Sequence, residues 1–417
     1  MQKIKLKSHP VILKNRDFQS IQISVLFFFE DNNSDMVNIQ LLPSMLRKMN
    51  NTYSSEEDFQ LNKKKLYILG INCSSSIIGT TNYISFDISI PNINILNEDL
   101  LEKQFKFFQD YIYNPKINDN AFDNDLLQRE IKNLQLSIKN ALNNIGFYQN
   151  KKLLDYVDDQ GILSRSLIDH QEEIGKVTGE SLYQFYLKNI KNNQPVIYIM
   201  GDVDSLKFNQ LCDKYLYRKK FVDKIYHANF NHFLKVRECV NLKCEDSSFK
   251  DSIYSMVFKV KDINENDIIL LNAIKDILSS PSSRLLDKVL RDDNDLIYSS
   301  LVKVYKFFGL LEITVFINKN NILMVKEKLN EVMELLKNEE LITECLEKIK
   351  ERKRLALIRQ LDDKYFLFDD FIESDLGIDV SFYKYLENYK KITWVDINDF
   401  IERLKLDTTY FLKEGED

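Results

Sequence analysis

The fold of this chain is decided by a stretch of sequence that occurs twice. Residues 176–186 read Lys-Val-Thr-Gly-Glu-Ser-Leu-Tyr-Gln-Phe-Tyr, and residues 391–401 read Lys-Ile-Thr-Trp-Val-Asp-Ile-Asn-Asp-Phe-Ile. Thr178 and Thr393 occupy the same position in the two copies, one in each half of the chain. Each copy is followed by a short apolar strand that ends in glycine.

A second pair of segments shows that the repeat is longer than this stretch. Ser20-Ile-Gln-Ile-Ser-Val-Leu-Phe-Phe-Phe-Glu and Ser252-Ile-Tyr-Ser-Met-Val-Phe-Lys-Val-Lys-Asp occur in the same order within the two halves. The closing glycines, Gly201 and Gly415, follow the two threonines at nearly the same distance. A repeat that spans half of the chain is a whole domain and is too long for a solenoid. A chain of 417 residues is also too long for one core, so we expect two homologous domains.

The expected domains are an N-terminal domain at 1–218 and a C-terminal domain at 244–417, with a connector at 219–243. Apolar spacing predicts the elements of each domain. The order of strands and helices predicts an α+β fold, in which mixed or antiparallel sheets pack against helices. In the first half we expect strands at 21–29 and 83–90 and helices at 36–49, 98–114 and from Asp119 to 144. In the second half we expect strands at 253–260, 296–305 and 310–317, and helices at 266–278, 322–337 and 341–359.

Charge and composition exclude several classes of protein. A net charge of −6 argues against nucleic-acid binding, which needs a basic face. Five scattered cysteines fit free thiols in a reducing compartment better than a disulfide framework. The first residues show no signal peptide, and no apolar run is long enough to cross a bilayer. We therefore expect a cytoplasmic protein that binds neither nucleic acid nor a membrane.

The chain shows no catalytic motif of its own. It has four histidines, and it lacks a phosphate-binding glycine loop, a dinucleotide fingerprint and a serine-nucleophile elbow. His170-Gln-Glu-Glu173 resembles half of a zinc motif, but a second histidine is missing. We interpret this segment as a solvated loop.

One segment of the second half points to a family. Ser282-Ser-Arg-Leu-Leu-Asp-Lys-Val-Leu-Arg291 is followed by Asp292-Asp-Asn-Asp-Leu-Ile-Tyr298-Ser. Together with the repeat and the element order, this segment resembles the pitrilysin/insulinase family of zinc peptidases, in the form with two homologous domains per chain. The passages at 41–46, 114–123 and 200–204 resemble its metal-less members. One departure is Leu278-Ser-Ser-Pro281, where many relatives have a glycine-rich loop.

The resemblance implies which positions correspond to a zinc site. The family's catalytic chains carry HxxEH on the first long helix and a glutamate on a later helix, and these hold zinc and activate water. The histidine, glutamate and histidine positions fall at Leu42, Met45 and Leu46, which cannot bind zinc or transfer a proton. Glu130 falls at the distal glutamate, and we expect it to be an ordinary exposed helix residue.

The resemblance also implies a substrate-binding pair, Arg291 and Tyr298. Their spacing places the arginine at a helix end and the tyrosine early on the next strand, where the two can grip a peptide carbonyl or an oxyanion. The ordinary alternative is an arginine favoured by the helix dipole beside a common strand residue. Arg284 is expected to lie on a different face of this helix.

The resulting expectation is a non-catalytic subunit of a heterodimeric zinc endopeptidase. This chain would hold no cofactor, and a partner chain bearing HxxEH would supply the zinc. An unfolded peptide or small protein would be held in a shared chamber, by adding a strand to a sheet edge. The alternative is a peptide-binding or assembly protein that acts without a peptidase partner.

Overall fold

The computed structural model describes residues 2–6, 9–29, 35–47, 49–79, 81–92, 98–217, 224–228, 231–378 and 381–415. The chain forms two compact units, neither of which is continuous in sequence. Unit 1 comprises Met1–Lys139, Ser166–Phe230 and Lys364–Asp379, and unit 2 comprises Asn140–Arg165, Asn231–Asp363 and Val380–Asp417. Each unit therefore includes one segment from the opposite half of the sequence. Part of the expected connector at 219–243 lies outside the described residues.

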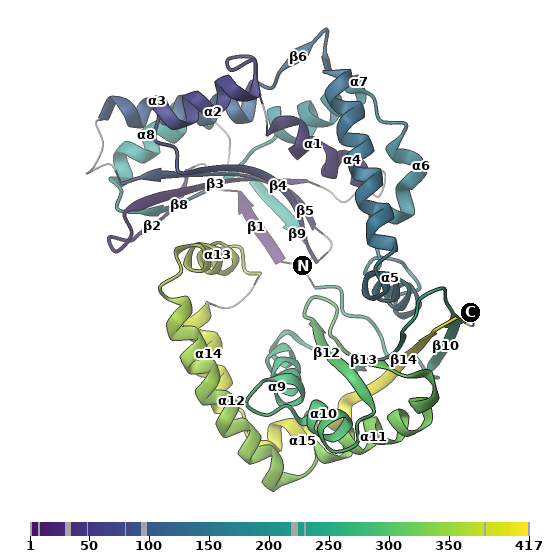
Figure 1. Cartoon of the computed structure of the whole chain (residues 1–417). Coiled ribbons are helices and arrows are strands. Elements are labelled where there is room, and N and C mark those ends of the chain that lie inside the picture. The colour runs from purple at the N-terminus through teal and green to yellow at the C-terminus, as the bar shows by residue number, and fades with distance from the viewer. Residues whose placement is uncertain are drawn as a thin grey trace. The chain divides into compact units, whose positions relative to one another are not determined.

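Unit 1 is built on a five-stranded mixed sheet (Figure 1). The strand order is β2-β8-β3-β5-β4, and only the β2–β8 pair is parallel. β3 is central and is buried throughout, as its β-branched and aromatic residues require. The strands are β2 (Val11–Lys14), β3 (Ser20–Phe29), β4 (Gly70–Ile78), β5 (Thr81–Pro91) and β8 (Val196–Gly201), and β1 (Gln2–Leu6) pairs separately with β9 (Lys224–Ala228).

The helices of unit 1 cover both faces of this sheet. α3 packs on the apolar face, where Phe27 meets Tyr113 with ring centroids 6.3 Å apart. α13 covers the opposite, polar face (Figure 1), where Lys364 Nζ donates to Ser20 Oγ at 2.9 Å and Tyr198 OH donates to Asp375 at 2.9 Å. The helices are α1 (Met36–Leu46), α2 (Glu56–Lys65), α3 (Glu98–Tyr113), α4 (Asn124–Leu142), α6 (Gln171–Ile174), α7 (Gly179–Tyr186), α8 (Ser205–Tyr215) and α13 (Lys364–Asp375).

Unit 2 repeats the sheet of unit 1 strand by strand. Its order is β10-β14-β11-β13-β12, and again only the first pair is parallel. The α+β class and the two homologous domains are therefore confirmed. The strands are β10 (Asn241–Asp246), β11 (Ser252–Val260), β12 (Ile297–Tyr305), β13 (Leu310–Ile317) and β14 (Leu404–Lys413).

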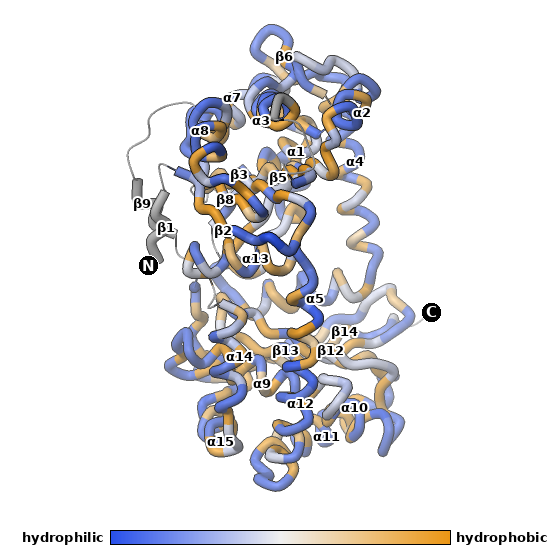
Figure 2. Tube along the Cα trace, turned by 90° about the vertical axis from the view of Figure 1, so that its left-hand side faces the viewer, coloured by the Kyte–Doolittle hydropathy of each residue, from blue (hydrophilic) through white to orange (hydrophobic). Residues whose placement is uncertain are grey.

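The helices of unit 2 are also divided between two faces. The main core lies on one face, and α5 covers the other, where Gln149 donates to Ser255 at 2.6 Å. In Figure 2 apolar positions recur between hydrophilic ones along the helices, as expected for helices with one packed face. The helices are α5 (Ile145–Val157), α9 (Ile268–Ser279), α10 (Leu285–Asp287), α11 (Ile322–Leu335), α12 (Glu339–Gln360), α14 (Phe382–Lys391) and α15 (Trp394–Arg403).

The stretch that occurs twice forms the same local structure in both units. Thr178 caps α7 and Thr393 caps α15, and each forms a reciprocal capping box with the residue three positions later. The backbone N–H of Ser181 donates to Thr178 Oγ1 at 3.1 Å, and the N–H of Asp396 donates to Thr393 Oγ1 at 3.4 Å. Each capped helix is followed by the strand that comes last in the sequence of its sheet, β8 in unit 1 and β14 in unit 2.

The strand alignment that equates Ser20 with Ser252 is out of register by one. It also equates Ile23 with Ser255, yet Ile23 contacts Phe105 and Phe108 of α3, whereas Ser255 bonds to α5 on the polar face. Side chains alternate between the two faces of a strand. In β3 the odd-numbered residues around Ile23 face the apolar core, whereas in β11 the odd-numbered Ser255 faces away from the main core. An even difference in residue number therefore matches residues that lie on opposite faces. The strands are equivalent, but their residues match at an odd offset.

Two expected helix boundaries are wrong. The helix predicted from Asp119 begins at Asn124, because Asp119 and Asn120 have φ of 48° and 61° and turn a hairpin between β6 (Ile117–Asn118) and β7 (Ala121–Phe122). Left-handed residues at both central positions are what a tight two-residue hairpin requires. The helix predicted to reach Met49 ends at Leu46.

None of the described helices is both long and apolar enough to cross a membrane.

Candidate functional site

The three positions predicted to correspond to zinc ligands are packed inside unit 1. Leu42, Met45 and Leu46 follow one another along the buried face of α1, with exposed fractions of 0%, 3% and 1%. Apolar side chains fill such a position without leaving polar groups unpaired. Among the described residues, no group of three or more histidines, cysteines or carboxylates could hold a metal ion.

Glu130 is not the exposed residue that we expected. Glu130 is only 8% exposed, and Arg129 Nε lies 3.7 Å from the Glu130 carboxylate. The reason is its spacing on α4, where Leu126, Leu127 and Ile131 are also buried. Positions 126, 127, 130 and 131 form one helical stripe, so Glu130 belongs to the packed face. The apolar spacing of Leu126, Leu127 and Ile131 around this glutamate is the sequence signal that we missed.

The segment carrying Arg291 is wound differently from the regular helix that we expected. Arg284 has a left-handed backbone, with φ of 50°, and precedes the short helix α10. A π-helical turn follows at Lys288–Asp292, and Arg291 lies within it. Single π-helical turns occur often at functional sites. This winding brings Arg284 and Arg291 to the same side of the turn.

The two arginines alternate with two aspartates in a closed ring of ion pairs, which we call the Arg–Asp ring. Arg291 Nη2 lies 3.4 Å from Asp287, and Arg291 Nε lies 3.3 Å from Asp292. Arg284 Nη2 lies 3.7 Å from Asp287 and 3.5 Å from Asp292, which closes the ring. Ser300 of β12 donates to Asp287 at 2.5 Å and so ties the ring to the sheet.

The Arg–Asp ring corrects our expectation for Arg284, which shares both carboxylates with Arg291. The four charges sum to zero, and the side chain of Arg291 remains 37% exposed. Exposed ion pairs contribute little to stability, but they restrict the direction of an arginine fork. Asp287 and Asp292 were missed from the sequence, although the four-residue spacing of Asp287 and Arg291 is that of a helical ion pair.

Tyr298 lies at an irregular position near the start of β12. Ile297 pairs with Ile317 and Ser299 pairs with Phe316, so the register shifts across Tyr298 and leaves it without a strand partner. Tyr298 is 60% exposed. Bulges of this kind re-aim side chains at sheet edges and next to active sites. The Arg291 guanidinium pairs with the carboxylates of the Arg–Asp ring. Among the described residues, it makes no hydrogen bond to the Tyr298 hydroxyl.

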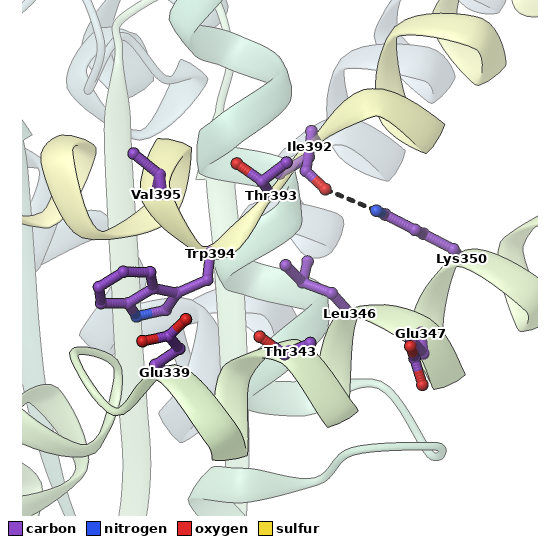
Figure 3. A pocket seen from close by; sticks show the side chains of 9 residues that line it. All are labelled: Glu339, Thr343, Leu346, Glu347, Lys350, Ile392, Thr393, Trp394 and Val395. Carbon is purple, nitrogen blue, oxygen red and sulfur yellow. Dashed lines mark hydrogen bonds between the residues drawn. The ribbon is translucent and has the colours of Figure 1, made fainter.

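A recess of about 310 Å³ lies elsewhere on unit 2, between α12 and the start of α15 (Figure 3). Trp394 forms one wall, and its indole lies beside the Glu339 carboxylate (Figure 3). Glu347 and Lys350 of α12 also line the recess. Lys350 Nζ donates to the Ile392 carbonyl at 2.5 Å, so this lysine closes one end of the recess.

His170 does not form a metal site in the structure. Its Nδ1 lies 2.9 Å from Glu173, three residues later, at the start of α6. The two residues form a local pair across one helical turn rather than a solvated loop, so this expectation is corrected.

Comparison with known proteins gives a family match. The model of the family described as "Peptidase M16 inactive domain" matches residues 176–353. The chain is 20% identical over 410 residues to a Bacillus subtilis (strain 168) protein named "Probable inactive metalloprotease YmfF", and the alignment covers 97% of this chain and 95% of YmfF.

Two solved structures show the same fold. A conserved protein from Enterococcus faecalis V583 has a TM-score of 0.88 and 17% identity, and the match covers 100% of this chain and 99% of that one. A protease from Helicobacter pylori has a TM-score of 0.78 and 16% identity, with 99% of each chain covered. The two-sheet fold is thus shared with peptidases, while the zinc-motif positions are apolar. These matches support a metal-less homologue of the M16 peptidases, the pitrilysin/insulinase family.

Proposed function

We propose that the chain is the non-catalytic subunit of a zinc-dependent endopeptidase and that it holds peptide substrate beside a partner's zinc site. The proposal is supported by the exposure of Arg291, whose side chain is 37% exposed, and of Tyr298, which is 60% exposed. Arg291 lies in the π-helical turn and Tyr298 at the start of β12, the next element, and we call this part of unit 2 the corner. The zinc-motif positions of unit 1 have been filled with apolar side chains, whereas this corner keeps polar groups. A chain that retains only substrate-binding groups acts with a partner that supplies the metal.

The edge of the sheet supports a peptide-binding role. β12 is the last strand of its sheet and pairs with β13 alone in the described part of the chain. Its exposed residues include Tyr298 and Leu301, which are 60% and 43% exposed. An extended peptide can add to such an edge through main-chain hydrogen bonds. Added there, it would run past Tyr298 at the end nearest the Arg–Asp ring.

The chemistry of the corner suits a peptide carbonyl. An arginine fork and a tyrosine hydroxyl are donors that can stabilise the oxyanion formed when a partner's zinc-bound water attacks. The Arg–Asp ring is neutral, so the corner offers directed donors without a net positive charge. A neutral carbonyl in the middle of a peptide therefore suits this corner better than a free carboxylate, in keeping with endopeptidase activity.

The test is to co-express the chain with an HxxEH-bearing homologue from the same genome and to purify the complex by a tag on this chain. We expect a stable heterodimer with about one zinc per pair, in keeping with a single catalytic site, and peptidase activity that neither chain has alone. The complex should no longer contain zinc when the two histidines of the partner's HxxEH motif are replaced. Stoichiometric zinc in this chain by itself would contradict the proposal, as would failure of every such homologue to bind it.

A further inference from the structure

The two copies of the repeated stretch differ at the residue that follows the capping threonine. In unit 1 this residue is Gly179, and in unit 2 it is Trp394, the only tryptophan in the chain. Both are the first residues of their helices, α7 and α15. The same position is therefore built to accommodate different neighbours in the two units.

In unit 1 an extended segment of the chain lies directly over this position. A Cβ on Gly179 would come within 2.4 Å of the Phe122 carbonyl oxygen, so only glycine leaves room for β7. The Phe122 ring packs edge-on against Tyr183 and Tyr186 of α7, at centroid distances of 6.1 and 6.3 Å. The β6–β7 hairpin, in the connector Asn114–Asp123 between α3 and α4, thus covers the start of α7.

Among the described residues of unit 2, the corresponding helices have no such hairpin between them. α11 and α12 are joined by Leu336–Asn338 alone, and no hairpin lies between these two helices. The recess of about 310 Å³ lies at this place, between α12 and Trp394. Trp394 fills part of the space, and its Nε1 donates to the Lys337 carbonyl at 3.3 Å. The rest remains open to solvent.

The side chains that line the recess favour a cationic occupant. Glu339 and Glu347 are exposed, and neither makes a hydrogen bond or ion pair with another described residue. The lysine of the recess, Lys350, is held by the Ile392 carbonyl. An indole ring next to free carboxylates is a favourable environment for a lysine or arginine side chain.

We propose that this recess is a docking site for an extended segment of a partner protein that carries a lysine or arginine. The segment would take the place that β7 occupies in unit 1, with an apolar side chain against Trp394 and a cationic one between Glu339 and Glu347. The residues that line this recess include neither Arg291 nor Tyr298. It requires neither zinc nor peptidase activity, so it can fail or hold independently of the proposed function.

The single tryptophan makes the site directly observable. We would titrate the full chain with the capped peptide Thr-Lys-Phe-Lys-Thr and follow tryptophan fluorescence, to which this peptide contributes nothing. The expected result is a saturable change that weakens with added salt. The matched peptide Thr-Glu-Phe-Glu-Thr should give none. No saturable change with the lysine peptide, or equal changes with both peptides, would overturn the proposal.

Substitution separates this site from general charge attraction. Glu339→Gln combined with Glu347→Gln should weaken binding of the lysine peptide by roughly fivefold or more, because two exposed ion pairs are lost. Thermal stability should be unchanged, since both side chains are exposed. The control is Glu340→Gln, an exposed neighbour on α12 that does not line the recess. Equal affinity in the double variant and the unmodified chain would contradict a cation site here.

Discussion

At the scale of single residues, Leu42, Met45 and Leu46, the positions predicted to correspond to zinc ligands, are apolar and buried. Each contributes apolar surface to the interior of unit 1, where a histidine or glutamate would have to be desolvated. Their correspondence to zinc ligands stays a prediction from the resemblance. Their complete burial could not be predicted from the motif, because it depends on how closely α1 packs on the sheet.

Rebuilding the motif should therefore damage the protein before it restores any activity. Leu42→His, Met45→Glu and Leu46→His together should lower the free energy of unfolding by about 3 kcal/mol or more, since three polar groups enter a packed site. Urea denaturation of the triple variant measures this loss. The control is Leu206→Ser, at a position that is 76% exposed. A triple variant as stable as the parent would show that α1 does not bury this face.

Asp87 is a second residue whose environment predicts a measurable effect. It lies on the polar face of the unit 1 sheet and accepts hydrogen bonds from Ser24 at 2.5 Å and Ser85 at 2.9 Å. Burial raises the pKa of its carboxyl above the ordinary value, and the two serine hydroxyls oppose this only in part. The charged form is therefore disfavoured in the folded state relative to the unfolded chain.

Asp87→Asn should stabilise the protein at neutral pH. An aspartate whose folded pKa is raised costs stability above that pKa, and the cost vanishes as pH falls below the unfolded value, where both states are protonated. The gain from asparagine should accordingly be present at pH 7 and absent near pH 3, in thermal melts across that range. A variant whose advantage grows on acidification would show that the carboxylate is stabilised, not penalised, in the fold.

At the scale of elements, sequence periodicity predicted most strands and helices but not their connections. The strands at 253–260 and 310–317 match β11 and β13 to within one residue. The hairpin at Asp119–Asn120 was missed because these two residues, which have a left-handed backbone, directly precede a helix. We included them in that helix. The π-helical turn at Lys288–Asp292 was also missed, and with it the Arg–Asp ring, since no local pattern distinguishes it from an α-helix.

α5 covers one face of the unit 2 sheet although it comes from the first half of the sequence. Leu153 and Val157 of α5 are fully buried against Val257, Leu310 and Tyr410 of the unit 2 sheet. A fragment of residues 231–417 lacks α5 and exposes these apolar side chains of the sheet. We expect it to bind a hydrophobic dye and to melt well below the full chain.

A peptide of residues 140–165 supplied in trans should restore part of the stability of this fragment. The same peptide with Leu153→Asp and Val157→Asp is the control and should restore none. If the fragment alone melts at the temperature of the full chain, α5 contributes nothing to unit 2.

At the scale of the whole molecule, the two units share a sheet order and a capped helix, yet they differ in what they retain. Unit 1 has apolar, buried residues at the positions predicted to correspond to zinc ligands, and unit 2 has an exposed arginine and tyrosine. The sequence predicted the duplication because the stretch that occurs twice is short and continuous in each half. It could not predict the exchange of α5 and α13 between the halves, which depends on contacts between residues distant in sequence.

The central claim is that Arg291 and Tyr298 act on substrate at a partner's zinc site. The measurement is peptidase turnover by the reconstituted pair, with Arg291→Ala and Tyr298→Phe compared with the exposed controls Arg354→Ala and Tyr383→Phe. We predict that either site change lowers kcat/KM by roughly a hundredfold, while thermal stability and partner binding stay unchanged. The controls should leave turnover unaltered. Unmodified kinetics in either site variant would contradict the claim.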